Sequence, residues 1–184
     1  MPDGDPTRSA SPIPAAGNLG ARPAAQTLTF LFTDIEGSTV LWEQFPDAMP
    51  ASLAQHDRIL RTAVEREGGR VVKTTGDGIM AVFGGAGDGL VASLHAQLGL
   101  QRESWSVTGP LRVRMGLHVG EAEIEGDGED YHGPAVNRAA RIMAAGHGGQ
   151  ALLSAATAAL VIDRLPEGVS LRDLGEHHLK DLSS

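Results

Sequence analysis

A chain of 184 residues, 41% hydrophobic and 21% charged, is long enough for one well-buried core and too short for two comfortable domains. Its net charge of -8, with no cluster of lysines and arginines, argues against a protein that binds nucleic acid through phosphate contacts. Because the chain has no cysteine and no apolar run near the roughly 20 residues that span a membrane, we exclude disulfides and thiolate zinc sites and expect a cytoplasmic protein without membrane insertion.

The chain begins with a segment, residues 1–26, that is rich in proline, alanine, glycine and serine. Such a segment cannot bury enough apolar surface to offset the entropy lost on ordering, so we predict a disordered arm. The folded domain is then predicted over residues 27–184. It opens with a strand over 27–33, indicated by alternation and by β-branched and aromatic residues, after which Ser38 or Thr39 offers a helix cap.

The middle of the chain shows the patterns of further helices and strands. These are a helix over 47–67, a hairpin of strands over 70–73 and 79–83, a helix over 88–101 and a strand over 111–119. In the last strand the apolar residues share one face, and the other face carries Arg112, Arg114 and His118. That strand therefore has a core side and a basic side.

The last third of the chain contains an amphipathic helix. An acidic, glycine-punctuated stretch over 121–131 predicts a turn or hairpin tip, and the helix follows over 133–145. At about 100° per residue, Asn137 and Arg141 fall together on the side opposite its apolar stripe, so both are available to a ligand. The chain is completed by a strand over 150–153, a helix to about residue 160, and strand-like segments over 169–174 and 177–179.

The order of these elements predicts the fold class. Strand, helix, two strands, helix and strand, with additions, indicate an α+β protein with a ferredoxin-like βαββαβ sandwich. We expect its helices to pack on one face of an antiparallel sheet.

Two aspartates stand in similar contexts. Asp34 ends the first strand and is followed by glycine and two hydroxyl residues, whereas Asp77 lies in the glycine-flanked turn of the predicted hairpin. An aspartate between two glycines is usually only part of a turn. The presence of a second aspartate at a strand end favours the other interpretation, a site for two metal ions beside a phosphate.

Four motifs, taken together, resemble those of one family. They are Phe32-Thr-Asp-Ile-Glu-Gly-Ser-Thr39, Lys73-Thr-Thr-Gly-Asp77, Arg112-Val-Arg-Met-Gly-Leu-His-Val-Gly120 and Asp130-Tyr-His-Gly-Pro-Ala-Val-Asn-Arg-Ala-Ala-Arg141. In order and approximate spacing they resemble the catalytic domain of class III nucleotidyl cyclases, of the adenylyl cyclase type. Each motif alone would be weak evidence, whereas the set is specific.

The resemblance implies a two-metal site. Asp34 and Asp77 would hold two divalent cations, with the backbone carbonyl of Ile35 as a further ligand. Oxygen-only ligands favour Mg²⁺ or Mn²⁺ over zinc. The cations would lower the pKa of the ribose 3'-hydroxyl and neutralise charge on ATP while that hydroxyl attacks the α-phosphate, which forms cyclic AMP and pyrophosphate.

The resemblance also implies the residues that bind ATP. Lys73 and Asp130 match the pair that selects adenine. The ring nitrogen of adenine accepts a hydrogen bond and its amine donates one, whereas guanine has a donor and an acceptor at the corresponding positions. Asn137 would orient the ribose. Arg141 would stabilise charge in the transition state, and Arg114 would bind phosphate.

Two lysines have competing explanations. Lys73 could simply form an ion pair with Asp77 or Glu36 on the surface, but the presence of Asp130 favours base selection. Lys180 matches a second phosphate-binding position, and a charged residue so near the end of the sequence is equally well explained as plain surface.

The spacing of Lys73 and Asp77 bears on the oligomeric state. They lie four residues apart on one predicted hairpin, yet the purine and the metal-bound phosphates lie at opposite ends of a nucleotide. We therefore expect a two-fold homodimer with its sites at the interface. One chain would supply Asp34, Ile35, Asp77 and Arg114, and the other would supply Lys73, Asp130, Asn137 and Arg141.

Two other functions stay open. A guanylyl or dual-specificity cyclase is a close alternative, although the identities of Lys73 and Asp130 disfavour it. A nucleotide-binding or dimerisation module with little activity is the second, since the family pattern usually continues beyond Ser184 and we therefore expect a domain shortened at its C-terminus.

Overall fold

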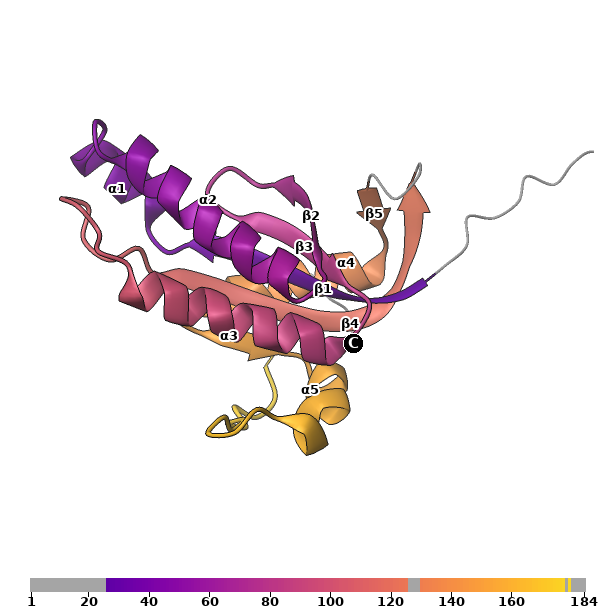
Figure 1. Cartoon of the computed structure of the whole chain (residues 1–184). Coiled ribbons are helices and arrows are strands. Elements are labelled where there is room, and N and C mark those ends of the chain that lie inside the picture. The colour runs from indigo at the N-terminus through magenta and orange to yellow at the C-terminus, as the bar shows by residue number, and fades with distance from the viewer. Residues whose placement is uncertain (1–25, 126–129, 178, 180–184) are drawn as a thin grey trace, which may run out of the picture.

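The structure of the chain, a computed structural model, describes residues 26–125, 130–177 and 179 (Figure 1). Its elements in chain order are β1 (Gln26–Ile35), α1 (Ser38–Gln44), α2 (Met49–Arg66), β2 (Arg70–Thr74), β3 (Ile79–Phe83), α3 (Ala86–Arg102), β4 (Val113–Glu125), β5 (Asp130–His132), α4 (Pro134–Ala145), β6 (Ala151–Leu153), α5 (Ala155–Val161) and a short 3₁₀ helix (Ile162–Arg164). Gln26 already belongs to β1, and the rest of the predicted N-terminal arm lies outside the described residues, as does Lys180. Within the described ranges, no helix has both the length and the apolar character to cross a bilayer.

β1 is the central strand of the sheet. The strand order is β2-β3-β1-β4-β5, with β6 beside β4, and among the described strands only β4 and β6 pair in parallel. The whole of β1 pairs with β4, and Thr29 to Phe32 also pair with β3. The predicted α+β fold with a mainly antiparallel sheet is confirmed, and so is the β2–β3 hairpin.

Helices cover both faces of this sheet, and not one face as predicted. Leu31 and Ile35 of β1 belong to the core beneath α2 and α3, whereas Phe30 and Phe32 belong to a second cluster with Ala139 of α4. In Figure 1, α2 and α3 lie on the near side of the sheet and α4 lies behind it. The prediction failed because β1 is apolar on both faces, and a strand buried on both sides needs a cover on each.

Two local features near the strand ends also differ from prediction. β4 starts at Val113 and continues to Glu125, and is therefore longer than predicted. It enters the stretch predicted as a turn or hairpin tip, and its antiparallel pairing with β5 confirms the hairpin. Neither Ser38 nor Thr39 caps a helix with its side chain. Instead, α1 begins at Ser38 itself, and the preceding Gly37 has the left-handed φ of 71° that glycine adopts easily.

The segment after the 3₁₀ helix carries no strand among its described residues. The sequence pattern predicts strands over 169–174 and 177–179, but residues 169–177 and 179 are described without one. Leu171 packs instead against an apolar cluster contributed by α3 and α5, which consists of Ala86, Leu90 and Val161. Leu171 therefore packs against the core without belonging to a strand, although the alternating pattern predicted one.

The close approach of α4 to β4 depends on a glycine. A Cβ atom on Gly116 would lie 2.3 Å from the backbone nitrogen and 2.6 Å from the Cα atom of Met143. These are backbone atoms, which a rotamer change cannot move. Gly116 therefore allows α4 to lie directly on the sheet.

We expect Gly116→Ala to lower the free energy of unfolding by about 1–3 kcal/mol, because α4 must shift to admit the methyl group. In α3, an added Cβ on Gly87 would meet no neighbouring heavy atom within 4 Å. Gly87→Ala should therefore raise stability by about 0.5–1 kcal/mol through helix propensity. Urea unfolding measures both shifts, and a similar shift for the two variants would contradict the close contact.

Candidate functional site

The register between β1 and β4 places an arginine beside Asp34. Asp34 and Arg114 are Cα partners in the ladder, and both side chains are half-buried. Nε of Arg114 donates to Oδ2 of Asp34 at 2.7 Å, and Nη2 forms an ion pair with the same oxygen at 2.5 Å. Because Phe30 and Phe32 face α4, alternation along β1 puts Asp34 on that face as well.

A tight turn brings Asp77 to the end of β1. Gly78 lies so close to β1 that a Cβ atom there would be 1.9 Å from the carbonyl oxygen of Thr33. The backbone amide of Ile79 donates to Oγ1 of Thr33 at 3.0 Å, which fixes the turn against the strand. The aspartates of the two separate motifs, Asp34 and Asp77, thereby lie close enough to interact.

Charge is unbalanced in this group, which we call the carboxylate site (Asp34, Asp77 and Arg114). Burial raises the pKa of Asp34, the hydrogen bond from Arg114 opposes that shift, and the negative charge of Asp77 adds to it. The group thus holds two carboxylates and one guanidinium. An additional cation would be stabilised beside them.

The donor set of the carboxylate site fits magnesium or manganese, because its ligands would be oxygens only. Ile35, the third predicted ligand, has its side chain in the core with 1% exposed, so only its backbone can face an ion. Among the described residues, no three acidic, histidine or cysteine side chains gather as a metal site. Water and substrate phosphate would fill the other positions, as is usual for Mg²⁺.

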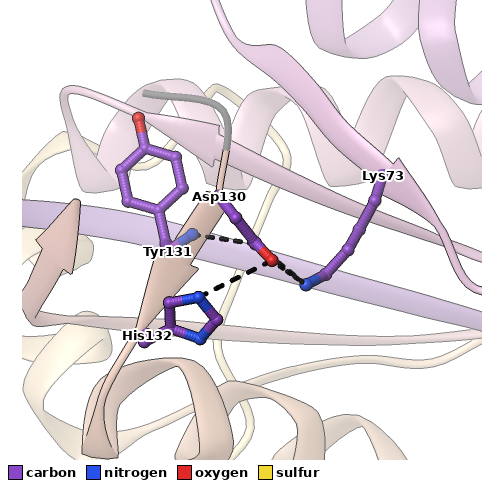
Figure 2. A network of polar contacts seen from close by, with 4 residues as sticks. All are labelled: Lys73, Asp130, Tyr131 and His132. Carbon is purple, nitrogen blue, oxygen red and sulfur yellow. Dashed lines mark hydrogen bonds and ion pairs between the residues drawn. The ribbon is translucent and has the colours of Figure 1, made fainter. Parts of the chain in front are cut away.

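Lys73 of β2 and Asp130 of β5 form an ion pair (Figure 2). Nζ of Lys73 donates to Oδ1 and Oδ2 of Asp130 at 2.8 and 2.7 Å. The backbone amide of Tyr131 donates to Oδ1 at 2.8 Å, and Nε2 of His132 lies 3.8 Å from Oδ2. The hydrogen bond from Lys73, followed by that from the Tyr131 amide, lowers the pKa of Asp130. Asp77, Glu36 and Asp130 were the possible partners of Lys73, and the structure shows its contact with Asp130.

A β-bulge decides which way Lys73 points. Val71 pairs with Ala81, whose side chain belongs to the core beneath α2 and α3. Lys73 pairs with Met80, which belongs to the cluster beneath α4, and the register shifts between the two pairs because Val72 is an extra residue. Since opposite residues of an antiparallel ladder share a face, Lys73 faces α4.

The sheet is hollowed beside Lys73 into a pocket of about 410 Å³, which we call the Lys73 pocket. Strands β1, β2 and β5 and helix α4 line it with Phe32, Lys73, Tyr131, His132, Gly133, Val136, Asn137 and Ala140. Asn137 and Arg141 are both exposed on α4, one turn apart, while the apolar stripe of the helix is buried, as predicted.

The predicted site residues therefore fall into two groups. Lys73 and Asn137 line the Lys73 pocket, Asp130 is bound to Lys73, and Arg141 lies on the next turn of α4. The second group is the carboxylate site, with the backbone of Ile35 beside it, and none of its members lines the pocket.

A second contact joins β2 and β5, and it was not predicted from the sequence. Nη2 of Arg70 donates to Oη of Tyr131 at 3.0 Å. Because β2 and β5 stand at opposite ends of the strand order, no spacing along the chain indicates that they touch. The sequence indicates that β2 and β5 are close only through the family resemblance, which pairs Lys73 with Asp130.

Comparison with known proteins identifies the family. A family model for the adenylate and guanylate cyclase catalytic domain matches residues 21–182, and the chain belongs to this family. The resemblance inferred from the four motifs is therefore confirmed.

Three relatives illustrate the similarity. An uncharacterised protein of Mycobacterium tuberculosis is 41% identical over 162 residues, which cover 87% of this chain and 54% of that protein. An adenylate cyclase of Lachancea kluyveri is 37% identical over 155 residues, which cover 72% of this chain and 8% of that protein. The solved structure of a Trypanosoma brucei adenylate cyclase in its monomeric state matches with a TM-score of 0.76 at 27% identity, covering 86% of this chain and 84% of that one. This chain thus spans about half the length of the mycobacterial relative and a small part of the fungal one.

We expect Asp77→Asn to stabilise the fold in the presence of a chelator. The charge of Asp77 contributes to the raised pKa of Asp34, so above the folded-state pKa of Asp34 the two charges repel each other and destabilise the native state. That penalty is absent at acidic pH, where Asp34 is protonated in both the folded and the unfolded state. The midpoint of urea unfolding should rise at neutral pH, and the gain should shrink as the pH falls.

The matched control is Asp47→Asn, at an exposed position between α1 and α2, which should leave the midpoint unchanged. A lower midpoint for Asp77→Asn at neutral pH would show that the two carboxylates do not repel each other.

Proposed function

We propose that this domain is an adenylyl cyclase that converts ATP to 3',5'-cyclic AMP and pyrophosphate at sites shared between two copies of the chain. The observation that carries the proposal is the Lys73–Asp130 ion pair beside a pocket that Asn137 also lines. Membership of the cyclase family supports the reaction class. The choice of ATP and the shared sites are inferred from the residues.

Base selection follows from the donors and acceptors at the Lys73 pocket. Nζ of Lys73 donates to a ring nitrogen of adenine, and the carboxylate of Asp130 accepts from the adenine amine. The lowered pKa of Asp130 keeps this carboxylate ionised, and thus an acceptor, at neutral pH. Guanine would place donor against donor and acceptor against acceptor, which costs about 1–3 kcal/mol for each buried group left unpaired.

The carboxylate site serves the triphosphate. Two divalent cations on Asp34, Asp77 and the Ile35 carbonyl would supply neutralisation of phosphate charge and activation of the 3'-hydroxyl. Arg114 already presents its planar fork to Asp34, and the same fork can bind phosphate oxygens in a bidentate manner. We assign the second phosphate contact to Lys180, which lies outside the described residues.

The exposed polar side of α4 serves the reacting centre. Asn137 lines the pocket and orients the ribose, so that its 3'-oxygen attacks the α-phosphate in line with the departing pyrophosphate. Arg141, one turn further along the exposed side, donates hydrogen bonds to the phosphate oxygens as charge develops on them. Neither residue has to act as a base.

The short span between Lys73 and Asp77 along the chain supports a shared site. Lys73 lies on β2 and Asp77 in the turn that follows it, so a single copy presents them four residues apart. One nucleotide must reach a purine-reading pair at one end and metal-bound phosphates at the other. A two-fold dimer satisfies both ends and forms two equivalent sites.

The direct test is an assay of cyclic nucleotide and pyrophosphate with ATP or GTP and manganese, over a range of protein concentrations. We expect ATP to be the better substrate and the rate per chain to rise as dimers form. A preference for GTP would indicate a guanylyl cyclase. Binding of ATP with metal and no release of pyrophosphate would indicate a nucleotide-binding module.

Shared sites also predict complementation between inactive variants. Asp77→Ala and Arg141→Ala should each abolish turnover, whereas their equimolar mixture should recover about a quarter of wild-type activity, since half of the dimers are mixed and each of these has one intact site of two. A mixture of Asp77→Ala with Asp34→Ala is the matched control and should stay inactive. Mixed dimers that form without recovery of activity, or equal recovery in the control mixture, would contradict shared sites.

A further inference from the structure

Two edge strands of the sheet touch although the strand order separates them. β2 stands at one end of the order β2-β3-β1-β4-β5 and β5 at the other. Figure 1 shows the far end of β4 bending away from the rest of the sheet, and β5 pairs with that end. Two side-chain contacts then join β5 to β2: Lys73 with Asp130, and Arg70 with Tyr131.

The second contact, which we call the clasp (Arg70 and Tyr131), holds an aromatic ring in a fixed orientation. The guanidinium of Arg70 donates to the Tyr131 hydroxyl at 3.0 Å and lies 5.6 Å from the ring centroid, within reach of a cation–π interaction. The ring of Phe30 meets that of Tyr131 edge-on, with 5.8 Å between centroids. Phe30 is 0% exposed and Tyr131 is 7% exposed, so the ring has a rigid support.

The clasp is linked to the purine-reading pair through the backbone. The amide of Tyr131 donates to Oδ1 of Asp130, and this oxygen also accepts from Lys73 (Figure 2). Arg70 and Lys73 both belong to β2, and Asp130 and Tyr131 both belong to β5. The two contacts therefore set the distance between the two strands, and these strands contribute Lys73 and Tyr131 to the lining of the Lys73 pocket.

We propose that Arg70 and Tyr131 are positioning residues that hold Lys73 and Asp130 at the separation and orientation needed to distinguish adenine from guanine. This inference rests on the proposed function of the Lys73 pocket. Arg70 does not line that pocket and acts through the tyrosine. A clasp that served stability alone would change the active fraction of the protein and affect both nucleotides equally.

The first test compares kcat and KM for ATP and GTP in four variants of the full chain. Arg70→Met removes the donor and the charge, Tyr131→Phe removes only the hydroxyl, and Arg70→Lys keeps a cationic donor. Arg61→Met, at an exposed position on α2, is the matched control. We expect Arg70→Met to reduce the ratio of kcat/KM for ATP to that for GTP about tenfold, mainly through a higher KM for ATP.

The other variants should change the ATP-to-GTP ratio of kcat/KM by smaller amounts. Tyr131→Phe should lose less than Arg70→Met, because its ring keeps the contacts with Arg70 and Phe30. Arg70→Lys should restore part of the ratio, and Arg61→Met should match wild type. An unchanged ratio in Arg70→Met and Tyr131→Phe would overturn the proposal, as would an equal loss of kcat for both nucleotides with unchanged KM.

A second test needs no turnover and follows the Asp130 carboxyl by carbon NMR during a pH titration, with its signal assigned from Asp130→Asn. Within the described part of the chain, the cationic groups that face it are Lys73 and, when protonated, His132. In wild type the pKa of Asp130 should lie below the usual range, and in Arg70→Met it should move up toward that range as the pair with Lys73 loosens. Equal titration in both proteins would overturn the proposal.

The two tests separate this inference from the proposed function. A wild-type chain that makes no cyclic nucleotide would refute the cyclase assignment, and the titration would still decide whether the clasp positions Asp130. An active wild type whose clasp variants keep both the nucleotide ratio and the Asp130 pKa would refute the clasp alone.

Discussion

β1 must pair along both of its edges and be covered on both of its faces, and this double constraint sets the position of the carboxylate site. Its ladder with β4 places Arg114 opposite Asp34. Its close approach to the turn at Gly78 brings in Asp77. A slip of one residue would exchange the two buried faces of β1, so the register is held by packing. The charged side chains therefore keep their positions even though two of them repel each other.

Charge is arranged differently in the two groups of residues, and this difference gives each a role. The carboxylate site holds two carboxylates and one guanidinium, which binds Asp34, whereas Lys73 and Asp130 are matched one to one. An excess of negative charge favours cations and the phosphates that accompany them. A matched donor and acceptor favours a neutral ligand that offers the complementary pair of groups, as adenine does. On the proposed account each copy carries both halves, and a two-fold axis brings unlike halves together.

Much of the fold could be predicted because its elements obey local rules. Alternation located the β2–β3 hairpin, and helical spacing placed Asn137 and Arg141 on the exposed side of α4. What could not be predicted depends on contacts between distant segments. The bulge at Val72 turns Lys73 toward α4, and the alternation of apolar and polar residues in the sequence does not indicate where a bulge occurs. The contact of Arg70 with Tyr131 joins opposite ends of the strand order and follows from the bend of β4, which pairing rules do not specify.

The most direct measurement is a crystal structure of the chain with Mn²⁺ and an ATP analogue that cannot cyclise. We expect Lys73 and Asp130 of one copy to contact the purine, while Asp34 and Asp77 of the partner subunit hold the manganese on the same nucleotide. A nucleotide whose purine and manganese are both contacted by side chains of a single copy would contradict this expectation.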